Sequence, residues 1–255
     1  MLLQAVAMGY RVHQDWLVQD VNLRFEPGDL HILLGANGAG KSSLLRVLCG
    51  ELAPDAGEVL LGGQSLASYT AGEKAERMAV LPQKSLLDFP FLGREVIQMG
   101  LYGRAKSVVN RSIDEVINAF ELQHLSTRPY TSLSGGEQQR VQIARVMAQL
   151  WDNRCDAVYL MDEPDSPLDL AHQIGLFTRL KQLANDGATV IVSTHDLNLA
   201  VKFADRLTLL KSGKVLATGS ADQVLTPELI MDAYGVATTV ETNNRGRINI
   251  DYLID

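Results

Sequence analysis

The sequence of 255 residues is poor in cysteine, in aromatic residues and in basic charge. Its two cysteines, Cys49 and Cys155, lie far apart and outside any CxxC or CxxH spacing, so we expect reduced thiols in a cytoplasmic protein, with no redox or metal role. Thirty acidic residues against 23 basic ones give a net charge of −7. That balance argues against binding to nucleic acid, because no basic excess is present to neutralise phosphates.

Long hydrophobic runs are also missing. No apolar stretch reaches the roughly 18 residues that a membrane-spanning helix needs. The N-terminal stretch MLLQAVAMGYRV is apolar, but it lacks the basic region and the small-residue cleavage site of a secretory signal. The composition, 46% hydrophobic and 21% charged, is that of an ordinary globular protein, which is our expectation for this chain.

The pattern of apolar residues divides the chain into three parts. In the first third, alternation predicts strands at 3–12 and 18–26, and a nearly continuous apolar run predicts a buried strand at 30–35. The middle, roughly 84–145, has helical spacing with short breaks. The last third alternates strand and helix again and includes a hairpin at 206–219. Alternating strands and helices predict an α/β fold with a mostly parallel sheet, into which the helical stretch is inserted.

The stretch GANGAGKS at 35–42 follows a predicted strand and opens a predicted helix. Its Gly-x-x-x-x-Gly-Lys-Ser pattern is that of the phosphate-binding P-loop. The glycines of such a loop let backbone N–H groups converge on a phosphate. Lys41 would reach the β- and γ-oxygens, and the Ser42 hydroxyl would bind Mg²⁺. The sequence therefore predicts a nucleoside triphosphate site.

Two carboxylates, Asp162 and Glu163, follow the apolar residues of VYLMDEP. Carboxylates at the mouth of a buried strand are costly unless a cation or another partner compensates them. We expect Asp162 on the Mg²⁺ side. Glu163 would point toward the γ-phosphate and could polarise the attacking water, an effect of roughly 10²–10⁴ in rate. The simpler alternative is a helix N-cap acid near Pro164.

Three further residues are weak signals when each is taken alone. Gln83 ends the stretch VLPQ, where its amide could meet Mg²⁺ or water, or could belong to a solvated loop. His195 follows the apolar strand of VIVSTHD, where a neutral imidazole could bond a γ-phosphate, or could be a capping or core residue. Tyr10 lies 25 positions before the P-loop and could stack on adenine, and Trp16 is its rival for that role.

A second loop of phosphate-binding character, TSLSGGEQQR at 131–140, has a serine and two glycines before a run of helix formers, but no lysine. Together with the P-loop, VLPQ, VYLMDEP, SPLD and STHD, in this order, it resembles the signature of the ATP-binding subunits of ABC transporters. The resemblance covers nearly the whole chain. In that family two nucleotide-binding domains pair head to tail, and the P-loop of one and the signature loop of the other enclose each ATP. The resemblance implies that this signature loop serves the nucleotide of a second copy of the chain.

The resemblance also implies the fold and the roles of individual residues. It implies a single nucleotide-binding domain over 1–255. Within it, 1–83 and 146–255 form a P-loop NTPase core with an N-terminal antiparallel β-subdomain, and 84–145 form a helical signature subdomain. The implied catalytic residues are Glu163, His195 and Gln83, the implied Mg²⁺ ligands are Ser42, Gln83 and Asp162, and Asp169 is the implied aspartate of the dimer-spanning loop. The nucleotide-binding set is Tyr10, Gly35, Ala36, Asn37, Gly38, Ala39, Gly40, Lys41, Ser42 and Ser43, and the signature set is Ser134, Gly135, Gly136 and Glu137.

The sequence departs from the family pattern in two places. Ser43 stands where threonine is usual, which is a minor change. The stretch DEPDSPLD carries Asp165 and Pro167 where threonine and alanine are commoner. Because proline fixes φ near −65° and removes an N–H, the dimer-spanning loop is where we expect this chain to differ most from its family.

The stretch DFPFLGREVIQMGLYGR at 88–104, with LDLAHQ and VLTPELIMDAYGV, is similar to the ATPases of iron-chelate, haem and vitamin B12 importers. The resemblance implies an ATP-hydrolysing subunit on the cytoplasmic face of the inner membrane. That subunit would power a polytopic permease and, indirectly, serve a periplasmic substrate-binding protein. Haemin is the expected cargo, with ferric siderophores and vitamin B12 as alternatives. Phe89, Phe91 and Arg94 are the predicted permease contacts, although apolar residues of this stretch could equally be subdomain core.

An alternative of another class is a soluble ABC ATPase without a membrane partner. Such proteins usually carry two cassettes, long coiled coils or basic arms, whereas this sequence has one cassette, no heptads and a net negative charge. A P-loop kinase would need an acceptor-binding lid, and it leaves the LSGGEQQR stretch unexplained. The expected cofactors are therefore ATP and Mg²⁺, and the expected partners are a second copy of the chain and a permease.

Overall fold

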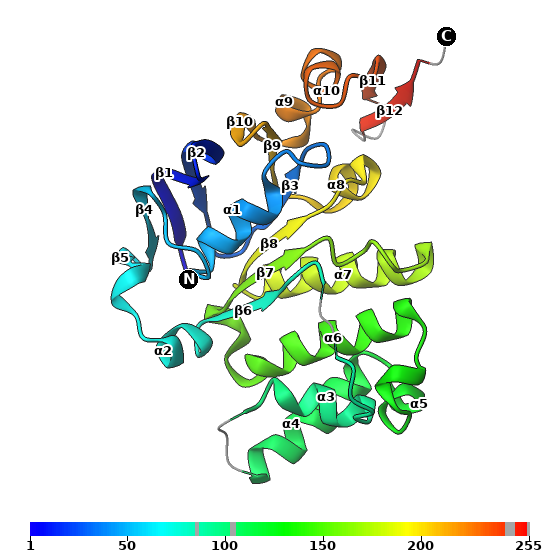
Figure 1. Cartoon of the computed structure of the whole chain (residues 1–255). Helices are drawn as coiled ribbons and strands as arrows, with labels where there is room; N and C mark the ends of the chain where they lie inside the picture. Colours follow the sequence, from blue (N-terminus) through cyan, green and yellow to red (C-terminus); the bar gives the residue numbers. More distant parts are fainter. Residues whose placement is uncertain (85–86, 103–105, 243–247, 254–255) are drawn as a thin grey trace.

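The computed structural model describes residues 1–84, 87–102, 106–242 and 248–253. Its centre is a six-stranded sheet in the order β10-β9-β3-β8-β7-β6 (Figure 1). Neighbouring strands of this sheet run parallel, except that β10 is antiparallel to β9. The mostly parallel sheet predicted from the sequence is confirmed. Its strands are β3 (Leu30–Leu34), β6 (Met78–Leu81), β7 (Val158–Asp162), β8 (Thr189–Ser193), β9 (Arg206–Lys211) and β10 (Lys214–Gly219).

Two smaller antiparallel sheets accompany the central one. The first has the order β2-β1-β4-β5 and is the antiparallel N-terminal β-subdomain that the family resemblance implied. The second pairs β11 with β12 near the C-terminus, and the sequence patterns did not predict it. The strands are β1 (Leu3–Val12), β2 (Asp15–Phe25), β4 (Ala56–Leu61), β5 (Gln64–Ser65), β11 (Thr238–Thr242) and β12 (Ile248–Tyr252).

Helices connect and cover these sheets. Those that pack near the central sheet are α1 (Lys41–Leu48), α2 (Ala71–Ala75), α7 (Leu170–Asn185), α8 (Leu197–Phe203), α9 (Ala221–Val224) and α10 (Pro227–Tyr234). The helical middle of the chain contains α3 (Gly93–Met99), α4 (Lys106–Ala119), α5 (Gln123–Ser126) and α6 (Gly135–Gln149). Among the described residues, no helix is long and apolar enough to cross a membrane.

The strands of the central sheet are buried on both faces, which explains their continuous apolar runs. Successive residues point into different cores. Ile32 and Met161 belong to the core beneath α7 and α8, whereas Leu33 and Leu160 belong to the core shared with α1 and the N-terminal sheet. The large sheet therefore holds its strand ends rigidly between two packed layers.

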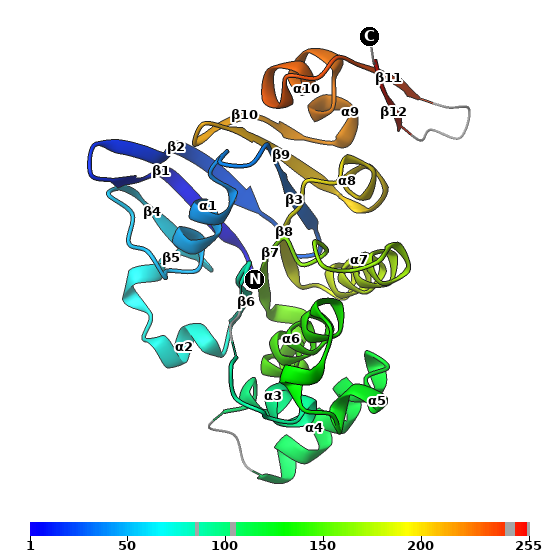
Figure 2. The same ribbon diagram turned by 45° about the vertical axis from the view of Figure 1, so that its right-hand side comes forward.

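The helical part has its own core but shares a helix with the rest of the chain. Figure 2 shows α3, α4 and α5 gathered at one end of the molecule, with α6 between them and the central sheet. Val141, Ala144 and Ala148 of α6 lie in the core of the helical part, whereas Ile143 and Met147 lie in the sheet core. The predicted boundary between residues 145 and 146 thus falls inside one helix that faces both cores.

Candidate active site

The P-loop joins the end of β3 to the start of α1, as its strand and helix neighbours predicted. Gly35 has φ +148°, and a Cβ at this position would lie 2.5 Å from the carbonyl oxygen of Leu210 on β9. Only glycine lets the chain pass so close to that strand. Gly40 precedes the first helical residue, Lys41, and the first turn of α1 contains no acidic residue. The positive end of this helix is therefore left available to an anion.

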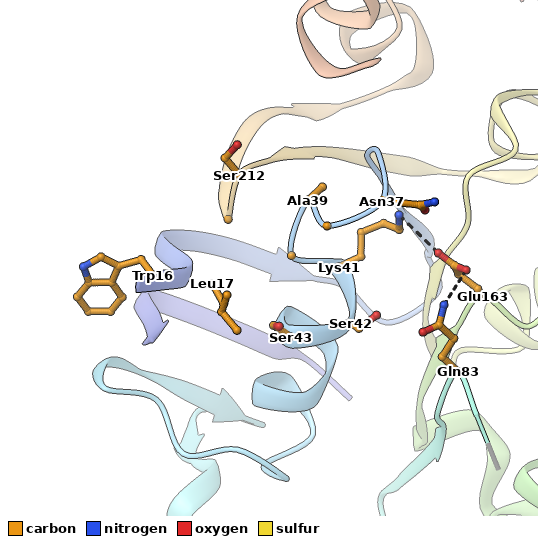
Figure 3. Close-up of a pocket in the computed structure, with 13 residues that line it drawn as sticks. Trp16, Leu17, Asn37, Ala39, Lys41, Ser42, Ser43, Gln83, Glu163 and Ser212 are labelled. Carbon is orange, nitrogen blue, oxygen red and sulfur yellow. Dashed lines mark hydrogen bonds and ion pairs between the residues drawn. The ribbon is translucent and has the colours of Figure 1, made fainter. Parts of the chain in front are cut away.

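Lys41 is the cation of the site and is almost fully buried, with 5% of its surface exposed. Its Nζ donates to the carbonyl oxygen of Gly35 at 2.7 Å and to that of Ala36 at 3.5 Å. It also forms an ion pair with Glu163, with 3.6 Å between Nζ and Oε1 (Figure 3). The lysine therefore spans the loop and reaches the end of β7.

Glu163 joins the lysine to the glutamine that follows β6. Gln83 Nε2 donates to Glu163 Oε2 at 3.0 Å, so the two carboxylate oxygens bond to different partners (Figure 3). Residues 41, 83 and 163 come from the ends of α1, β6 and β7, which meet at the same edge of the sheet. The structure thus brings the predicted nucleotide-binding Lys41 together with Gln83 and Glu163, two of the three predicted catalytic residues.

Ser193 is a residue of this site that the sequence reasoning missed. Its Oγ accepts the backbone N–H of Glu163 at 2.9 Å and donates to Asp162 Oδ1 at 2.5 Å. Asp162 ends β7 and Ser193 ends the neighbouring β8, and the two residues are paired across the parallel strands. The signal was available, because both residues are polar and both follow four apolar or β-branched strand residues.

Lys41, Gln83 and Glu163 line a cleft of about 660 Å³. The wall is formed by P-loop residues, by the turn between β9 and β10, and by the start of β2. In Figure 3, Trp16 and Glu163 lie at opposite ends of the residues drawn. The lining residues are Trp16, Leu17, Asn37, Gly38, Ala39, Gly40, Lys41, Ser42, Ser43, Gln83, Glu163, Ser212 and Gly213.

Trp16, and not Tyr10, is the aromatic side chain that lines this cleft. Tyr10 is half-buried and packs against the core between the two sheets. The Trp16 ring lies close over Gly9, where a Cβ would come within 2.7 Å of Cζ3, and the Arg11 guanidinium lies 5.5 Å from its centre. The rival that the sequence left open therefore has the better position, because the β1–β2 register places Trp16 opposite Arg11 near the hairpin tip.

His195 and Asp169 lie outside the cleft, and the predicted residues Gly35, Ala36 and Asp162 do not line it either. His195 is exposed, two positions beyond the end of β8. Asp169 caps the N-terminus of α7, where its Oδ1 accepts the backbone N–H of His172 at 2.9 Å and contacts His172 Nδ1 at 2.8 Å. The bond from that backbone N–H is the main reason why the Asp169 pKa lies below its usual value.

Asp165, one of the two unusual residues before α7, is buried. Its Oδ2 accepts a hydrogen bond from Thr194 Oγ1 at 2.7 Å. Among the described residues, its other oxygen has no hydrogen-bond partner. Burial raises the pKa of this carboxyl above its usual value, and the bond from Thr194 opposes that rise. Asp165 thus links the loop after β7 to the loop after β8, a role that the sequence did not suggest.

The signature residues form the N-terminus of α6, away from the cleft that Lys41 lines. Ser134 is the N-cap. Its N–H donates to Glu137 Oε2 at 2.8 Å, and its Oγ accepts the Glu137 N–H at 3.4 Å, which makes a capping box. The Ser134 N–H is the first cause that holds the Glu137 pKa below its usual value, and Arg128 pairs with the same carboxylate at 3.0 Å.

The predicted permease contacts lie before and at the start of α3. Phe89 is 68% exposed and Phe91 is 37% exposed, with 6.1 Å between their ring centres. Arg94 forms an ion pair with Asp114 of α4, with 2.6 Å between Nη1 and Oδ1. The predicted range 88–104 includes residues 103 and 104, which lie outside the described residues.

Mg²⁺ fits the donor set at the end of the sheet. In the described part of the chain, no group of three or more histidine, cysteine, aspartate or glutamate side chains is arranged to hold a metal ion. Mg²⁺ often uses one or two carboxylates and completes its shell with phosphate oxygens and water. Ser42, Gln83 and Asp162 offer one hydroxyl, one amide and one carboxylate near the P-loop, which suits an ion shared with a phosphate.

Comparison with known proteins agrees with this geometry. The sequence model of the ABC transporter family matches residues 18–166. A "Hemin import ATP-binding protein HmuV" of Pseudomonas fluorescens is 42% identical over 244 residues, which cover 95% of this chain and 96% of that protein. The protein of the same name from Gloeobacter violaceus is 44% identical over 250 residues, which cover 96% of this chain and 91% of that protein.

Solved structures give the same result. A structure described as an inward-facing metal-chelate type ABC transporter matches with a TM-score of 0.81 and 26% identity, over 99% of this chain and 97% of that one. An ATP-binding cassette in a dimeric post-hydrolysis state, bound to ADP and Pi, matches with a TM-score of 0.75 and 26% identity, over 86% of this chain and 98% of that one. From the family match, the near full-length relatives and the fold, the chain belongs to the ATP-binding subunits of the ABC transporter family.

Proposed function

We propose that this chain is the ATPase subunit of a haemin importer, bound peripherally to a permease at the cytoplasmic face of the inner membrane. The observation that carries the ATPase part is the Glu163 carboxylate, which lies between Lys41 and Gln83 at the mouth of the P-loop. Haemin is proposed as the cargo because the chain is 42–44% identical, over nearly its full length, to two proteins named for haemin import.

ATP would lie along the cleft from Trp16 to Glu163. The P-loop N–H groups and the N-terminus of α1 would hold its phosphates. A γ-phosphate would draw Lys41 away from the carbonyl oxygens of Gly35 and Ala36, which it contacts in this structure. The exposed Trp16 ring at the far end of the cleft could stack on adenine. Mg²⁺ would be held by Ser42, Gln83 and Asp162 and would neutralise charge on the phosphate oxygens.

Hydrolysis would depend on the way Glu163 is held. When Lys41 turns to a phosphate, the Glu163 carboxylate loses its ion-pair partner and can accept a proton from water. Gln83 would keep the carboxylate oriented through its bond to Oε2. His195 would need to move toward the γ-phosphate, since it is exposed beyond the end of β8 in this structure.

A second copy of the chain would complete each site. Of the described residues, none in the range 134–137 lines the cleft, although the N-terminus of α6 offers amides without intrahelical partners. Head-to-tail pairing would place Ser134 and Gly136 against the partner's nucleotide, as the family resemblance implies. Asp169 at the start of α7 would cross the same interface.

The permease would contact the exposed aromatic residues before α3. Phe89 and Phe91 follow Gln83 by only a few residues, so a change at the nucleotide would reach them along a short segment of the chain. Because Arg94 is already paired with Asp114 inside the helical part, it would contribute less to such a contact than the two phenylalanines.

The cargo is tested by reconstitution. We expect the chain to co-purify with its permease and, in vesicles with the cognate binding protein, to hydrolyse ATP faster when haemin is supplied. A ferric siderophore and cobalamin are the comparison substrates. If a ferric siderophore or cobalamin stimulates hydrolysis and haemin does not, that compound is the cargo. Failure to associate with any permease would favour a soluble ATPase. The Glu163→Gln variant in the same vesicles is the control, because it should lose stimulation with every substrate.

A further inference from the structure

A tyrosine at the C-terminal end of α10 contacts the first glycine of the P-loop. The backbone N–H of Gly35 donates to the hydroxyl oxygen of Tyr234 at 2.9 Å, although the two residues are 199 positions apart in the chain. Tyr234 is the last residue of α10, and Gly235 in the left-handed conformation, φ +71°, ends the helix directly after it. Figure 1 shows α10 on the side of the sheet formed by β9 and β10, and β9 is the neighbour of β3.

Gly35 is held from three sides. Its N–H is bound by Tyr234, its carbonyl oxygen accepts from Lys41 Nζ at 2.7 Å, and the absence of a Cβ lets it lie against Leu210. The Lys41 bond is one that a bound phosphate would take away, since Lys41 would turn to the phosphate oxygens. The Tyr234 bond lies outside the cleft and does not compete with a ligand.

The same helix has a second connection to the rim of the cleft. Asp232 of α10 forms an ion pair with Lys211, with 2.5 Å between Oδ1 and Nζ, and Lys211 ends β9 directly before Ser212 and Gly213. Gly213 lines the cleft and donates its N–H to the carbonyl oxygen of Ala39 in the P-loop at 2.9 Å. Helix α10 therefore reaches the P-loop both at its first glycine and, through the β9–β10 turn, at Ala39.

The protonation state of the Tyr234 hydroxyl is compatible with its hydrogen bond from the Gly35 N–H. Tyr234 is half-buried and packs against the sheet core. Burial raises its pKa to about 12, so the side chain stays a neutral phenol at any pH at which the protein would work. A neutral hydroxyl can accept the Gly35 N–H without bringing a negative charge beside a loop that binds phosphates.

We propose that Tyr234 is a positioning residue for the phosphate-binding loop. Its hydroxyl fixes the first glycine of the loop, so the affinity for nucleotide depends on helix α10 near the C-terminus. The inference rests on the proposed ATP site and gives Tyr234 a role at that site, whereas the sequence alone assigned its stretch VLTPELIMDAYGV no role at the nucleotide. Tyr234 is not among the residues that line the cleft, so we expect its hydroxyl to act on binding and not on the chemical step.

The test is the Tyr234→Phe variant of the full chain, which keeps the ring and removes the hydroxyl. The control is Tyr69→Phe, because the Tyr69 hydroxyl also bonds a backbone group, the carbonyl oxygen of Leu61 at 3.0 Å, in the N-terminal sheet. We expect the Kd and KM for Mg-ATP to rise about fivefold in Tyr234→Phe, as for the loss of one hydrogen bond, with kcat changed less than about twofold. Tyr69→Phe should leave the KM unchanged.

Each outcome decides the proposal. All measurements are made well below the melting temperature of each variant, and exchange of the Gly35 amide hydrogen is followed in parallel. A faster exchange at Gly35 with a higher KM supports the proposal. An unchanged KM overturns it, even if the melting temperature falls, and so does a variant that does not fold. If the wild type itself fails to bind Mg-ATP, the proposed function fails and not this inference.

Discussion

Among single residues of the candidate site, Glu163 has a strained backbone. Its φ of +46° is a left-handed conformation that costs a residue with a side chain ~1–2 kcal/mol. Ser193 helps to hold that conformation, because its Oγ accepts the Glu163 N–H. The turn directs the carboxylate back over the P-loop to Lys41 and Gln83. A strained backbone at this position supports a catalytic assignment more strongly than a simple helix N-cap acid.

Glu163→Gln should keep ATP binding and lower the turnover number by roughly 10²-fold or more, because an amide does not accept the proton of the attacking water. The uncleaved γ-phosphate should then hold two copies of the chain together. Light scattering with and without Mg-ATP measures this dimer, and a phosphate-release assay measures turnover. Near-normal turnover in the variant would remove Glu163 from the catalytic set.

Asp165→Asn should raise the free energy of unfolding at neutral pH. The native pKa of Asp165 is raised, so the folded state binds the proton more tightly than the unfolded state, and stability falls as pH rises from the ordinary pKa of 3.8 through the native value. Asparagine does not titrate, so it removes this decline. The gain in the free energy of unfolding is up to about 1.4 kcal/mol for each pH unit between the ordinary and the native pKa of Asp165. Urea unfolding of both proteins at a series of pH values measures the difference, which should shrink as pH falls toward 3.8.

The matched control is Asp169→Asn, four positions later. The native pKa of Asp169 is lowered, so its charged form stabilises the fold above its ordinary pKa, and that contribution is lost as pH falls. The two substitutions should therefore change stability at neutral pH in opposite directions. A stability of Asp165→Asn equal to that of the wild type at every pH would contradict the assigned cause, the burial of the carboxyl.

The sequence predicted those site residues whose roles depend on a short, contiguous motif. Gly35, Lys41 and Glu163 follow from a strand, a loop and a helix that are contiguous in the chain. The choice between Tyr10 and Trp16 stayed open and Tyr234 was not suggested, because these positions depend on strand register and on packing between distant segments. For Ser193 the sequence held part of the signal, because a polar residue follows an apolar strand there. The pairing of β7 with β8 was needed to place it beside Asp162.

At the scale of elements, α6 connects the signature residues to both cores. Its N-terminus carries the capping box of Ser134 and Glu137, and its body packs against the helical part on one side and the sheet on the other. Gln139 Nε2 donates to the carbonyl oxygen of Pro164 at 3.0 Å, one residue after Glu163. The signature end of α6 is thus linked within one chain to the turn that holds Glu163.

A mixture of Lys41→Ala and Ser134→Arg chains should regain ATPase activity that neither variant has alone. Lys41→Ala removes a chain's own P-loop lysine, whereas Ser134→Arg blocks only the site of the partner. The heterodimer therefore contains one site with an intact P-loop and an intact signature loop. Phosphate release after mixing measures the recovery, and the prediction holds if one site can turn over alone.

Two controls separate this arrangement from damage to the fold. Ser134→Ala removes the N-cap side chain without added bulk and should lower stability by ~1 kcal/mol, while dimers still form. Ser134→Arg alone should bind Mg-ATP as a monomer with the affinity of the wild type. A large loss of that monomer affinity would mean that the signature loop acts on its own chain's nucleotide.

The elements themselves were predicted well where the apolar pattern was long and regular. The strands β1, β3, β7 and β8, the β9–β10 hairpin and the helix α6 lie where the pattern placed them. The β11–β12 hairpin was missed, because short strands with alternating polar residues near a chain end give little periodic signal. The helical boundary fell inside α6 because one helix with two apolar faces gives no break in periodicity.

At the scale of the whole molecule, the exposed phenylalanines lie at the end of the chain segment that leaves the nucleotide site. Phe89 is more exposed than Phe91, and the backbone of Phe91 is fixed to the helical part by the bond from the Tyr130 N–H to its carbonyl oxygen at 2.7 Å. A side chain on a fixed backbone suits an interface anchor, because binding then costs little further conformational entropy.

Phe89→Ala should weaken association with the permease by about tenfold or more and lower the ratio of substrate-stimulated to basal turnover. The melting temperature of the isolated subunit should stay that of the wild type, because the side chain is mostly exposed. Tyr252→Ala, another exposed aromatic residue, on β12, is the control and should leave association unchanged. A much lower melting temperature of Phe89→Ala would place this residue in the core and remove it from the interface.

The two-sided packing of α6 has a consequence for exchanging parts between relatives. A chimera cut at residue 145 would combine the front half of one helix with the back half of another, and both cores would receive mismatched side chains within the same three turns. Cuts placed before Ser134 and after Gln83 leave the whole of α6 with the sheet, so only the smaller core must be repacked. Transplanted helical segments should therefore fold in this host when their donor supplies α3 to α5 and the host keeps its own α6.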